Sequence, residues 1–155
     1  MRYRLYSPED FPALYAIEEA CFEPPFRFSR RYLRSIIQSA QSATWLAEIR
    51  ENLSGFSVIE WSGHANALVA YLQTIEVLPE FRMHGVGREL LNRSQASALA
   101  AGVRHIWLHV DEFNTSAIRL YESDGYVRQA RKENYYPHGR AALVLSKAIQ
   151  PGTVS

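Results

Sequence analysis

The chain has little cysteine, no long apolar run and no excess of charge of either sign. Its single cysteine, Cys21, excludes an internal disulfide bond and a cysteine-rich zinc site. No apolar run approaches the roughly 18 residues that a membrane-spanning helix needs, and the first residues lack the apolar core of a signal peptide. The net charge of +1 argues against a broad basic face for nucleic acid. We therefore expect a cytoplasmic protein with no metal and no direct binding to nucleic acid or membrane.

What is present is the composition of an ordinary globular domain. Hydrophobic residues make up 47% of the 155 residues and charged residues 21%, which suits one domain with a hydrophobic core. No internal repeat, low-complexity segment or linker-like stretch divides the chain. The prediction is a single domain over residues 1–155, present as a monomer or a homodimer.

Apolar periodicity predicts a mixed α/β fold. Alternating or β-branched segments predict strands over 2–6, 43–50, 55–61, 67–78, 105–110, 126–134 and 141–148. Apolar stripes at helical spacing predict helices after Asp10, after Ser29, over 86–101 and over 116–123. The segment 67–78 is almost continuously apolar, which is typical of a strand at the centre of a sheet that is covered on both faces.

Some residues have predicted local roles within these elements. Asp10 and Ser29 are expected to cap the first two helices, and Asn52 and Ser54 to form the hairpin turn between the second and third strands. The expected inward positions of the first three helices are Phe11, Leu14, Ile17 and Cys21, then Leu33, Ile36, Ile37 and Ala40, then Leu90, Leu91, Ala96 and Leu99.

The most informative segment follows the long central strand. Arg82-x-x-Gly85-x-Gly87 leads from a strand that ends at Pro79 into a helical pattern. Glycine permits positive φ and close backbone approach, and a helix start offers unpaired N–H groups with partial positive charge. This combination binds anions, usually phosphate. The spacing matches neither the GxxxxGK[ST] loop of nucleotide hydrolases nor the GxGxxG of dinucleotide folds.

Ordered segments along the chain resemble the GNAT acetyltransferases, in particular the ribosomal-protein-alanine N-acetyltransferase branch. The glycine turn is similar to the family's Q/R-x-x-G-x-G/A signature, which grips the pyrophosphate of coenzyme A. The other similar segments are Ile17-Glu-Glu-Ala-Cys-Phe22, Asn114-x-x-Ala117-x-x-x-Tyr121 with the following Gly125-Tyr126, and Asn134-Tyr-Tyr-Pro137. Together they cover nearly the whole length and imply the GNAT fold, a mixed, mostly antiparallel central sheet flanked by helices.

The resemblance implies acetyl-CoA as the donor and assigns residues to its binding. Gly85 and Gly87 would free backbone amides for the pyrophosphate. Backbone groups at Ile75 and Val77 would hold the pantetheine arm and polarise the thioester carbonyl. Asn114 would reach the same arm with its amide, although asparagine equally suits a turn or a cap. The full set implied for the donor is Ile75, Val77, Arg82, His84, Gly85, Val86, Gly87, Arg88 and Asn114.

The resemblance also implies catalytic residues. Tyr121 would give a proton to the departing thiolate, whereas its residue type alone indicates a core tyrosine. The chain departs from the branch at the general base, because His109 stands where the ribosomal-protein enzymes carry a glutamate. Histidine is able to act as a base, with an ordinary pKa of ~6.5. Glu76 in the preceding strand and a water molecule are the alternatives, and as bare sequence Glu76 reads as a surface glutamate.

The acceptor is less well defined. Tyr135 and Tyr136 are expected to line its cleft, but Arg140 lies where relatives often carry an acidic residue just before the last strand. The prediction is an N-acetyltransferase that transfers acetyl to a primary amine by direct attack, with a protein N-terminal α-amine as the leading acceptor. A small amine such as a polyamine, an amino acid or an aminoglycoside is an alternative acceptor. A non-catalytic acyl-CoA sensor is the alternative from another class of protein.

Overall fold

The computed structural model describes residues 1–64 and 66–152; Ala65 and residues 153–155 of the predicted domain lie outside the described residues. The strands are β1 (Arg2–Leu5), β2 (Ser42–Ile49), β3 (Asn52–Ser62), β4 (Val69–Val77), β5 (His105–Asp111), β6 (Val127–Lys132) and β7 (Ala142–Ala148). The helices are α1 (Phe11–Cys21), α2 (Arg30–Ile37), α3 (Val86–Ala100) and α4 (Thr115–Ser123). Every predicted helix and strand is present, with ends that shift by a few residues.

The strands form one seven-stranded sheet in the order β1-β2-β3-β4-β5-β7-β6. All neighbouring pairs are antiparallel except β4 and β5, which are parallel. The prediction of a mixed, mostly antiparallel sheet is therefore confirmed. So is the central place of the apolar segment 67–78, because β4 is the fourth of the seven strands.

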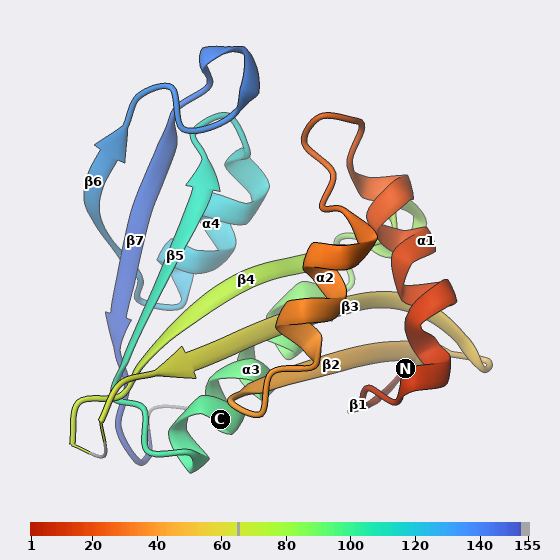
Figure 1. Ribbon diagram of the computed structural model, residues 1–155, viewed down its shortest axis with the longest axis horizontal. Coiled ribbons are helices and arrows are strands. Elements are labelled where there is room, and N and C mark those ends of the chain that lie inside the picture. Colours follow the sequence, from red (N-terminus) through yellow and green to blue (C-terminus); the bar gives the residue numbers. More distant parts are fainter. Residues whose placement is uncertain (65, 153–155) are drawn as a thin grey trace.

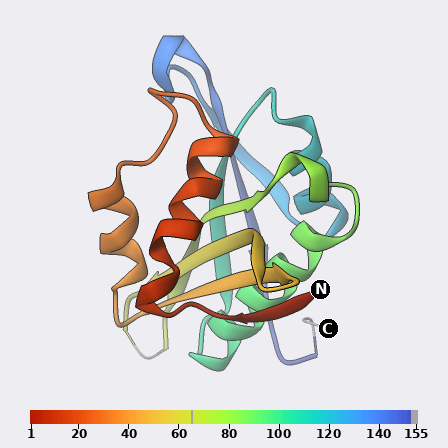
Figure 2. The same ribbon diagram turned by 90° about the vertical axis from the view of Figure 1, so that its right-hand side faces the viewer.

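Helices cover both faces of the sheet (Figures 1 and 2). α1 and α2 pack on one face, where Leu14 and Leu33 meet the buried Phe56 of β3. α3 and α4 lie on the other, where Leu91 and Ile118 join the main core cluster. All five of these side chains are at most 6% exposed. Among the described residues, no helix is long and apolar enough to cross a membrane.

The predicted caps had different outcomes. Ser29 caps α2, because its hydroxyl accepts from Tyr32 N at 3.0 Å. Asp10 precedes α1 but does not cap it: its carboxylate accepts from Ser7 N and from the Arg4 guanidinium, each at 2.8 Å. The Arg4 charge and the free Ser7 amide satisfy the carboxylate better than a second amide within the helix would.

Three other expectations were wrong in detail. The β2–β3 hairpin turns at Arg50 and Glu51, which both have positive φ, while Asn52 already belongs to β3. This is the backbone of a two-residue hairpin loop, which normally selects asparagine or glycine. Ala40 lies beyond the end of α2 and is exposed, and Ala96 on α3 is exposed, with Ala98 buried instead. Ala98 lies seven residues after Leu91 and therefore on the same inward face of α3, whereas Ala96 lies outside that face.

A bulge in β4 determines which of its side chains face α1 and α2. Val58 of β3 pairs with Thr74 and the next residue, Ile59, pairs with Leu72, so Gln73 is the extra residue on β4. A bulge shifts the alternation of side chains by one. Ile75 consequently packs with the α3 side, like Leu72 before the bulge, and Glu76 falls on the α1 side.

Candidate active site

The central strands separate partway along the sheet. β4 and β5 pair over three residues each, and the last pair is Tyr71 with Trp107. β4 continues to Val77 and β5 to Asp111, and the two strands diverge beyond the last pair (Figure 1). In the part of the chain that the structure describes, no β5 residue pairs with β4 after Tyr71. Backbone groups on this edge are thus available to a ligand that inserts between the strands.

The glycine turn lies just after β4 and the 3-10 turn η2 (Pro79–Phe81). Gly85 occupies the N-cap of α3 with φ of 81°, a conformation that glycine adopts without steric cost. A Cβ built on Gly85 has no atom within 4 Å, and one built on Gly87 meets Leu120 at 3.5 Å and nothing closer. The turn is therefore open, and the unpaired N–H groups of the first turn of a 15-residue helix lie beside it. This arrangement suits a phosphate group.

The charged residues predicted for the donor differ in their surroundings. Arg82 Nε donates to Val77 O at 2.8 Å, so this arginine fastens the turn to the end of β4. Arg88 donates to Ser123 Oγ at 2.6 Å and links α3 to the end of α4. His84 is exposed beside them. Two of the three predicted charges thus have a structural contact as well as a position at the turn.

Helix α4 carries the next two predicted residues. Asn114 caps α4, since its Oδ1 accepts from Ala117 N at 3.2 Å. Tyr121 is 7% exposed and packs against the Tyr126 ring at 5.7 Å. The Tyr126 hydroxyl donates to Gln95, whereas that of Tyr121 makes no hydrogen bond within the described residues. Burial raises the pKa of Tyr121, so its hydroxyl keeps its proton at neutral pH.

His109 lies on β5 just beyond the point where the strands separate. Its Nδ1 is hydrogen-bonded to the Tyr71 hydroxyl across that point, at 2.8 Å. Its Nε2 is buried and has no partner among the residues described. Burial, and then the charge of Lys132, lower the pKa of His109 below its ordinary value. The imidazole is therefore neutral at pH 7 and able to accept a proton.

Aromatic rings surround this pair. Tyr135 stacks on His109 with ring centroids 4.6 Å apart and planes at 10°, and Tyr136 meets Tyr135 edge to face at 4.9 Å. Burial is the main cause that raises the pKa of Tyr71, and Tyr135 raises it further. Burial is also the main cause that raises the pKa of Tyr136. The structure thus brings the predicted Tyr135 and Tyr136 together with His109.

A hollow of about 420 Å³ adjoins Tyr71 on the same face of the sheet. Trp61 and Trp107 line it with Glu60, whose carboxylate accepts from Gln73 Nε2. Glu60 forms no ion pair within residues 1–64 and 66–152. The Trp61 ring itself packs on the opposite face with Ile59 and Ala70. The hollow therefore offers the Trp107 ring and the Glu60 carboxylate beside the Tyr71–His109 pair, both of which favour a positively charged ligand.

Glu76, the rival base, is buried and not on the surface. It is 3% exposed on the α1 face of β4, and its Oε2 accepts from the Thr74 hydroxyl at 2.9 Å. Burial raises its pKa well above the ordinary value, and contact with the Glu18 carboxyl on α1 raises it further. Glu76 is consequently protonated over a wider range of pH than an exposed glutamate.

Arg140 closes one end of the acceptor side. Its guanidinium forms an ion pair with Asp111 at the end of β5 and lies 5.2 Å from the Phe26 ring. Phe26 belongs to the loop between α1 and α2, and its ring is 6.1 Å from that of His138. Arg140 thus joins that loop to the loop before β7, and its charge is matched by Asp111.

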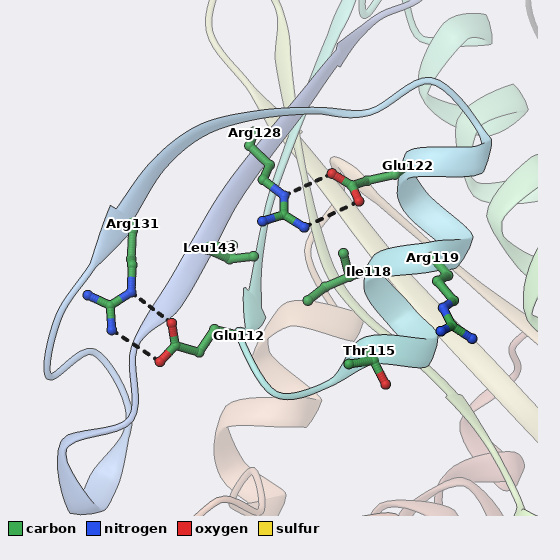
Figure 3. Close-up of a pocket in the computed structure, with 8 residues that line it drawn as sticks. All are labelled: Glu112, Thr115, Ile118, Arg119, Glu122, Arg128, Arg131 and Leu143. Atoms are coloured by element: carbon green, nitrogen blue, oxygen red, sulfur yellow. Dashed lines mark hydrogen bonds and ion pairs between the residues drawn. The ribbon is translucent and has the colours of Figure 1, made fainter.

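The residues that line a second hollow, of about 440 Å³, include neither Tyr71 nor His109 (Figure 3). It is formed by α4 with β6 and β7, and Ile118 and Leu143 lie in it. Two ion pairs border it, Arg128 with Glu122 at 2.9 Å and Arg131 with Glu112 at 2.7 Å. These charges neutralise one another, so we assign the hollow no catalytic role.

The separated central strands and the open glycine turn before α3 agree with the GNAT fold that the sequence resemblance implies. The chain belongs to the acetyltransferase (GNAT) family, whose sequence model matches residues 11–126. The ribosomal protein bS18-alanine N-acetyltransferase of Salmonella typhimurium is 41% identical over 83 residues, which are 52% of this chain and 56% of that protein. Streptothricin acetyltransferase of Streptomyces lavendulae is 32% identical over 90 residues, 57% of this chain and 47% of that protein. The chain thus spans about half the length of the curated relatives that it matches.

A solved structure extends the similarity over nearly the whole chain. The ribosomal-protein-S18-alanine N-acetyltransferase of Escherichia coli superposes with a TM-score of 0.84 and 26% identity, covering 96% of this chain and 94% of that one. A plant NAA60 from Arabidopsis thaliana, solved with a bisubstrate analogue, has the same TM-score at 21% identity and covers 96% and 98% of the two chains. The predicted GNAT fold is therefore confirmed.

Two residues of the site were missed by the sequence reasoning. The apolar run over 67–78 does not single out Tyr71, although this residue has a polar tip inside that run. Glu18 is not among the expected inward residues of α1, although it lies four residues after Leu14 and so falls on the same inward face. A charged residue at a core position was the available signal, since buried carboxylates are rare unless they are paired.

Proposed function

We propose that the protein is an acetyl-CoA-dependent N-acetyltransferase whose acceptor is the α-amine of a protein N-terminus. The observation that carries this proposal is the hydrogen bond between Tyr71 and His109, formed where β4 and β5 separate. The similarity to the bS18-alanine enzymes supports the same donor and the same class of acceptor. A cytoplasmic location remains a prediction.

The donor side fits coenzyme A through its own geometry. The glycine turn has room for a phosphate group at Gly85, and the β4 edge beyond Tyr71 has no strand beside it in the described part of the chain. We propose that N–H groups of Val86 and Gly87 hold the pyrophosphate with His84 and Arg88 nearby, and that the backbone of Ile75 and Val77 holds the pantetheine arm. Asn114 would complete that wall beside its role as a cap.

When bound, acetyl-CoA supplies an acetyl group as a thioester, and the acceptor nitrogen takes that group as the carbon–sulfur bond breaks. The amine must lose its protons for this to happen. An α-amine with a pKa of ~7.7–8.0 costs about 1 kcal/mol to deprotonate at pH 7, whereas lysine at ~10.4 costs about 4 to 5 kcal/mol. A neutral histidine is an adequate base for the first and a weak one for the second.

We assign the proton transfers to three side chains. Tyr71 keeps its own proton at neutral pH, so its oxygen accepts from the amine as its hydroxyl donates to His109 Nδ1. The lowered pKa of His109 keeps Nδ1 free to accept. Tyr121, which holds its proton because it is buried, gives it to the sulfur. Glu76 is the weaker candidate for the base, since burial raises its pKa and so keeps it protonated over a wider range of pH.

The test is a thiol-release assay with acetyl-CoA, N-terminal peptides that begin with alanine, and a panel of small amines. Saturable release on peptides with a free α-amine, and none on the same peptides blocked at the N-terminus, supports the proposal. Release that requires a lysine side chain contradicts it. Coenzyme A binding without release on any acceptor indicates a sensor and would overturn the enzyme assignment.

A small-molecule amine is the second candidate acceptor, favoured by the hollow beside Tyr71. Glu60 and the indole ring of Trp107 offer a site for a second positive charge next to the acetylated amine. The partial similarity to streptothricin acetyltransferase supports this class of acceptor. A kcat/KM for a polyamine or an aminoglycoside well above that for every peptide would select it.

A further inference from the structure

Two buried carboxyl groups face each other between α1 and β4. Glu18 is 0% exposed and Glu76 is 3% exposed. In each of them Oε2 accepts a hydrogen bond, from Phe28 N at 3.0 Å for Glu18 and from the Thr74 hydroxyl at 2.9 Å for Glu76. In each of them Oε1 is buried and has no partner among the residues described. The two side chains are neighbours, because α1 lies against this end of β4: the Cys21 thiol, one turn after Glu18, is 3.6 Å from Val77 O, and the Glu18 carboxyl contributes to the raised pKa of Glu76.

A single proton placed between the two Oε1 atoms gives each of them a hydrogen-bond partner. Two ionised carboxylates in contact repel, and at a buried position neither is relieved by water. If one carboxyl is protonated, its O–H donates to the other, and both oxygens are satisfied. The pair then carries one negative charge, which the hydrogen bonds from Phe28 N and the Thr74 hydroxyl stabilise.

We propose that Glu18 and Glu76 share one proton between their Oε1 atoms. We propose further that this bond positions the loop between α1 and α2, which flanks the acceptor, against the donor strand β4. The inference rests on the proposed function only for its kinetic readout. Neither side chain needs to touch substrate, so both are positioning residues.

The contacts of the two glutamates explain why the pair positions the loop between α1 and α2 relative to β4. Glu18 holds the backbone at Phe28, whose carbonyl also accepts from the Tyr15 hydroxyl at 2.7 Å. The same loop carries Phe26, which contacts Arg140 on the far side of the acceptor cleft. Glu76 lies between Ile75 and Val77, whose backbone is proposed to hold the donor. The shared proton therefore links the loop that flanks the acceptor to the strand that holds the acetyl group.

Two other titratable groups face the pair. Cys21 lies on α1 one turn after Glu18, and burial, with a smaller contribution from Glu76, raises the pKa of its thiol to about 11. Arg82, in the segment after β4, lies 3.6 Å from the Cys21 sulfur. With its pKa at about 11, the Cys21 thiol keeps its proton between pH 4 and 9, so a pH effect in that range that depends on both glutamates is assigned to the pair.

The sign of the pH effect follows from the raised pKa of Glu76. The folded protein holds the proton at pH values where an exposed glutamate, with a pKa of ~4.3, has lost it. The stability that the pair contributes is thus fully present below about pH 4.3 and is lost as the pH rises through the raised pKa of Glu76. We expect the Tm of Glu76→Gln, which cannot ionise, to fall less steeply with pH over this range than that of the wild type.

The direct test is infrared spectroscopy of the whole chain, which reports the carbonyl stretch of a protonated carboxyl group. We expect such a band at pH 7 in the wild type and in the control Glu19→Gln, an exposed neighbour on α1. The band should be lost in Glu18→Gln and in Glu76→Gln, because each amide donates to the remaining ionised carboxylate. A wild-type spectrum without the band, or a band that survives both substitutions, overturns the proposal.

Kinetics separate positioning from simple structural support. Glu18→Gln keeps the hydrogen bond, and we expect its KM for the peptide acceptor to stay within about twofold of the wild-type value. Glu18→Leu removes the bond, and we expect that KM to rise about tenfold while the KM for acetyl-CoA is unchanged. Equal KM values for the two variants contradict the positioning role. If Glu18→Leu does not fold, Glu76→Gln and the infrared band still decide the matter, and an inactive wild type would refute the proposed function without touching the band.

Discussion

The two sides of this site differ in the groups that form them: backbone groups form the side proposed to bind the donor (the donor wall), and side chains form the side proposed to bind the acceptor (the acceptor wall). On the donor side the backbone is arranged for use: a glycine N-cap with φ of 81°, a helix start, and a β4 edge beyond Tyr71 that β5 leaves unpaired. On the acceptor side the groups are side chains from separate elements, namely Tyr71 on β4, His109 on β5 and Tyr135 in the loop before β7. Backbone features require few residue types in fixed order, whereas side chains that converge in space leave no such order in the sequence.

This difference predicts that substitutions on the two walls change different measured quantities. Changes on the acceptor wall should act on turnover and on its pH dependence. Changes on the donor wall should act on the affinity for acetyl-CoA. An acceptor-wall variant that changes the affinity for acetyl-CoA, or a donor-wall variant that changes turnover, would show that the two walls are coupled.

The largest effect is expected for His109→Ala on the acceptor wall. Removing a general base typically lowers the rate 10²–10⁴-fold, and we expect a fall of this size in kcat with the Kd for acetyl-CoA unchanged. In the wild type the pKa of His109 is lowered, so kcat/KM should decline only below the ordinary histidine pKa of ~6.5, where Nδ1 becomes protonated. The variant should lose that acidic limb. Full activity of His109→Ala over pH 6–9 would remove the residue from the mechanism.

A smaller loss of turnover is expected for Tyr121→Phe, about 10²-fold in kcat, because the sulfur then leaves without a proton from the protein. Tyr126→Phe is the matched control, since Tyr126 is a neighbouring buried tyrosine whose hydroxyl donates to Gln95. It should lower stability by about 1 kcal/mol and leave kcat nearly unchanged. An equal loss of kcat in both variants would mean that Tyr121 supports the core and is not the acid.

The same contrast explains what the sequence could predict. The fold followed from apolar periodicity, and the central position of β4 followed from its continuous apolar run. The glycine turn was readable because positive φ and close approach restrict the residue type. The Tyr71–His109 bond was not, because it depends on where β4 and β5 separate. The burial of Glu76 was not either, since the bulge at Gln73 turns that side chain toward α1 and nothing in the strand pattern marks a bulge.

On the donor wall, Gly87→Ala should weaken acetyl-CoA binding without unfolding the protein. The added Cβ meets only Leu120 at 3.5 Å and other side-chain atoms at 4.0 Å, which is ordinary contact. It would, however, crowd the approach of a phosphate to the first turn of α3. We expect Kd for acetyl-CoA, measured by calorimetry, to rise about tenfold while Tm changes by no more than a degree or two, since the loss of one close contact is worth about 1 to 2 kcal/mol. An unchanged Kd would place the pyrophosphate elsewhere.

The smallest effect is expected for Gly85→Ala, and it is one of stability. Gly85 has φ of 81° and open space around the position of a Cβ, so alanine there is strained by backbone conformation alone. The left-handed conformation costs an ordinary residue about 1 to 2 kcal/mol, which lowers Tm by a few degrees in a chain of this size. Gly85→Asn is the matched comparison, because asparagine tolerates this conformation and should recover part of the loss. Equal destabilisation by both residues would mean that side-chain crowding, and not φ, is what the turn excludes.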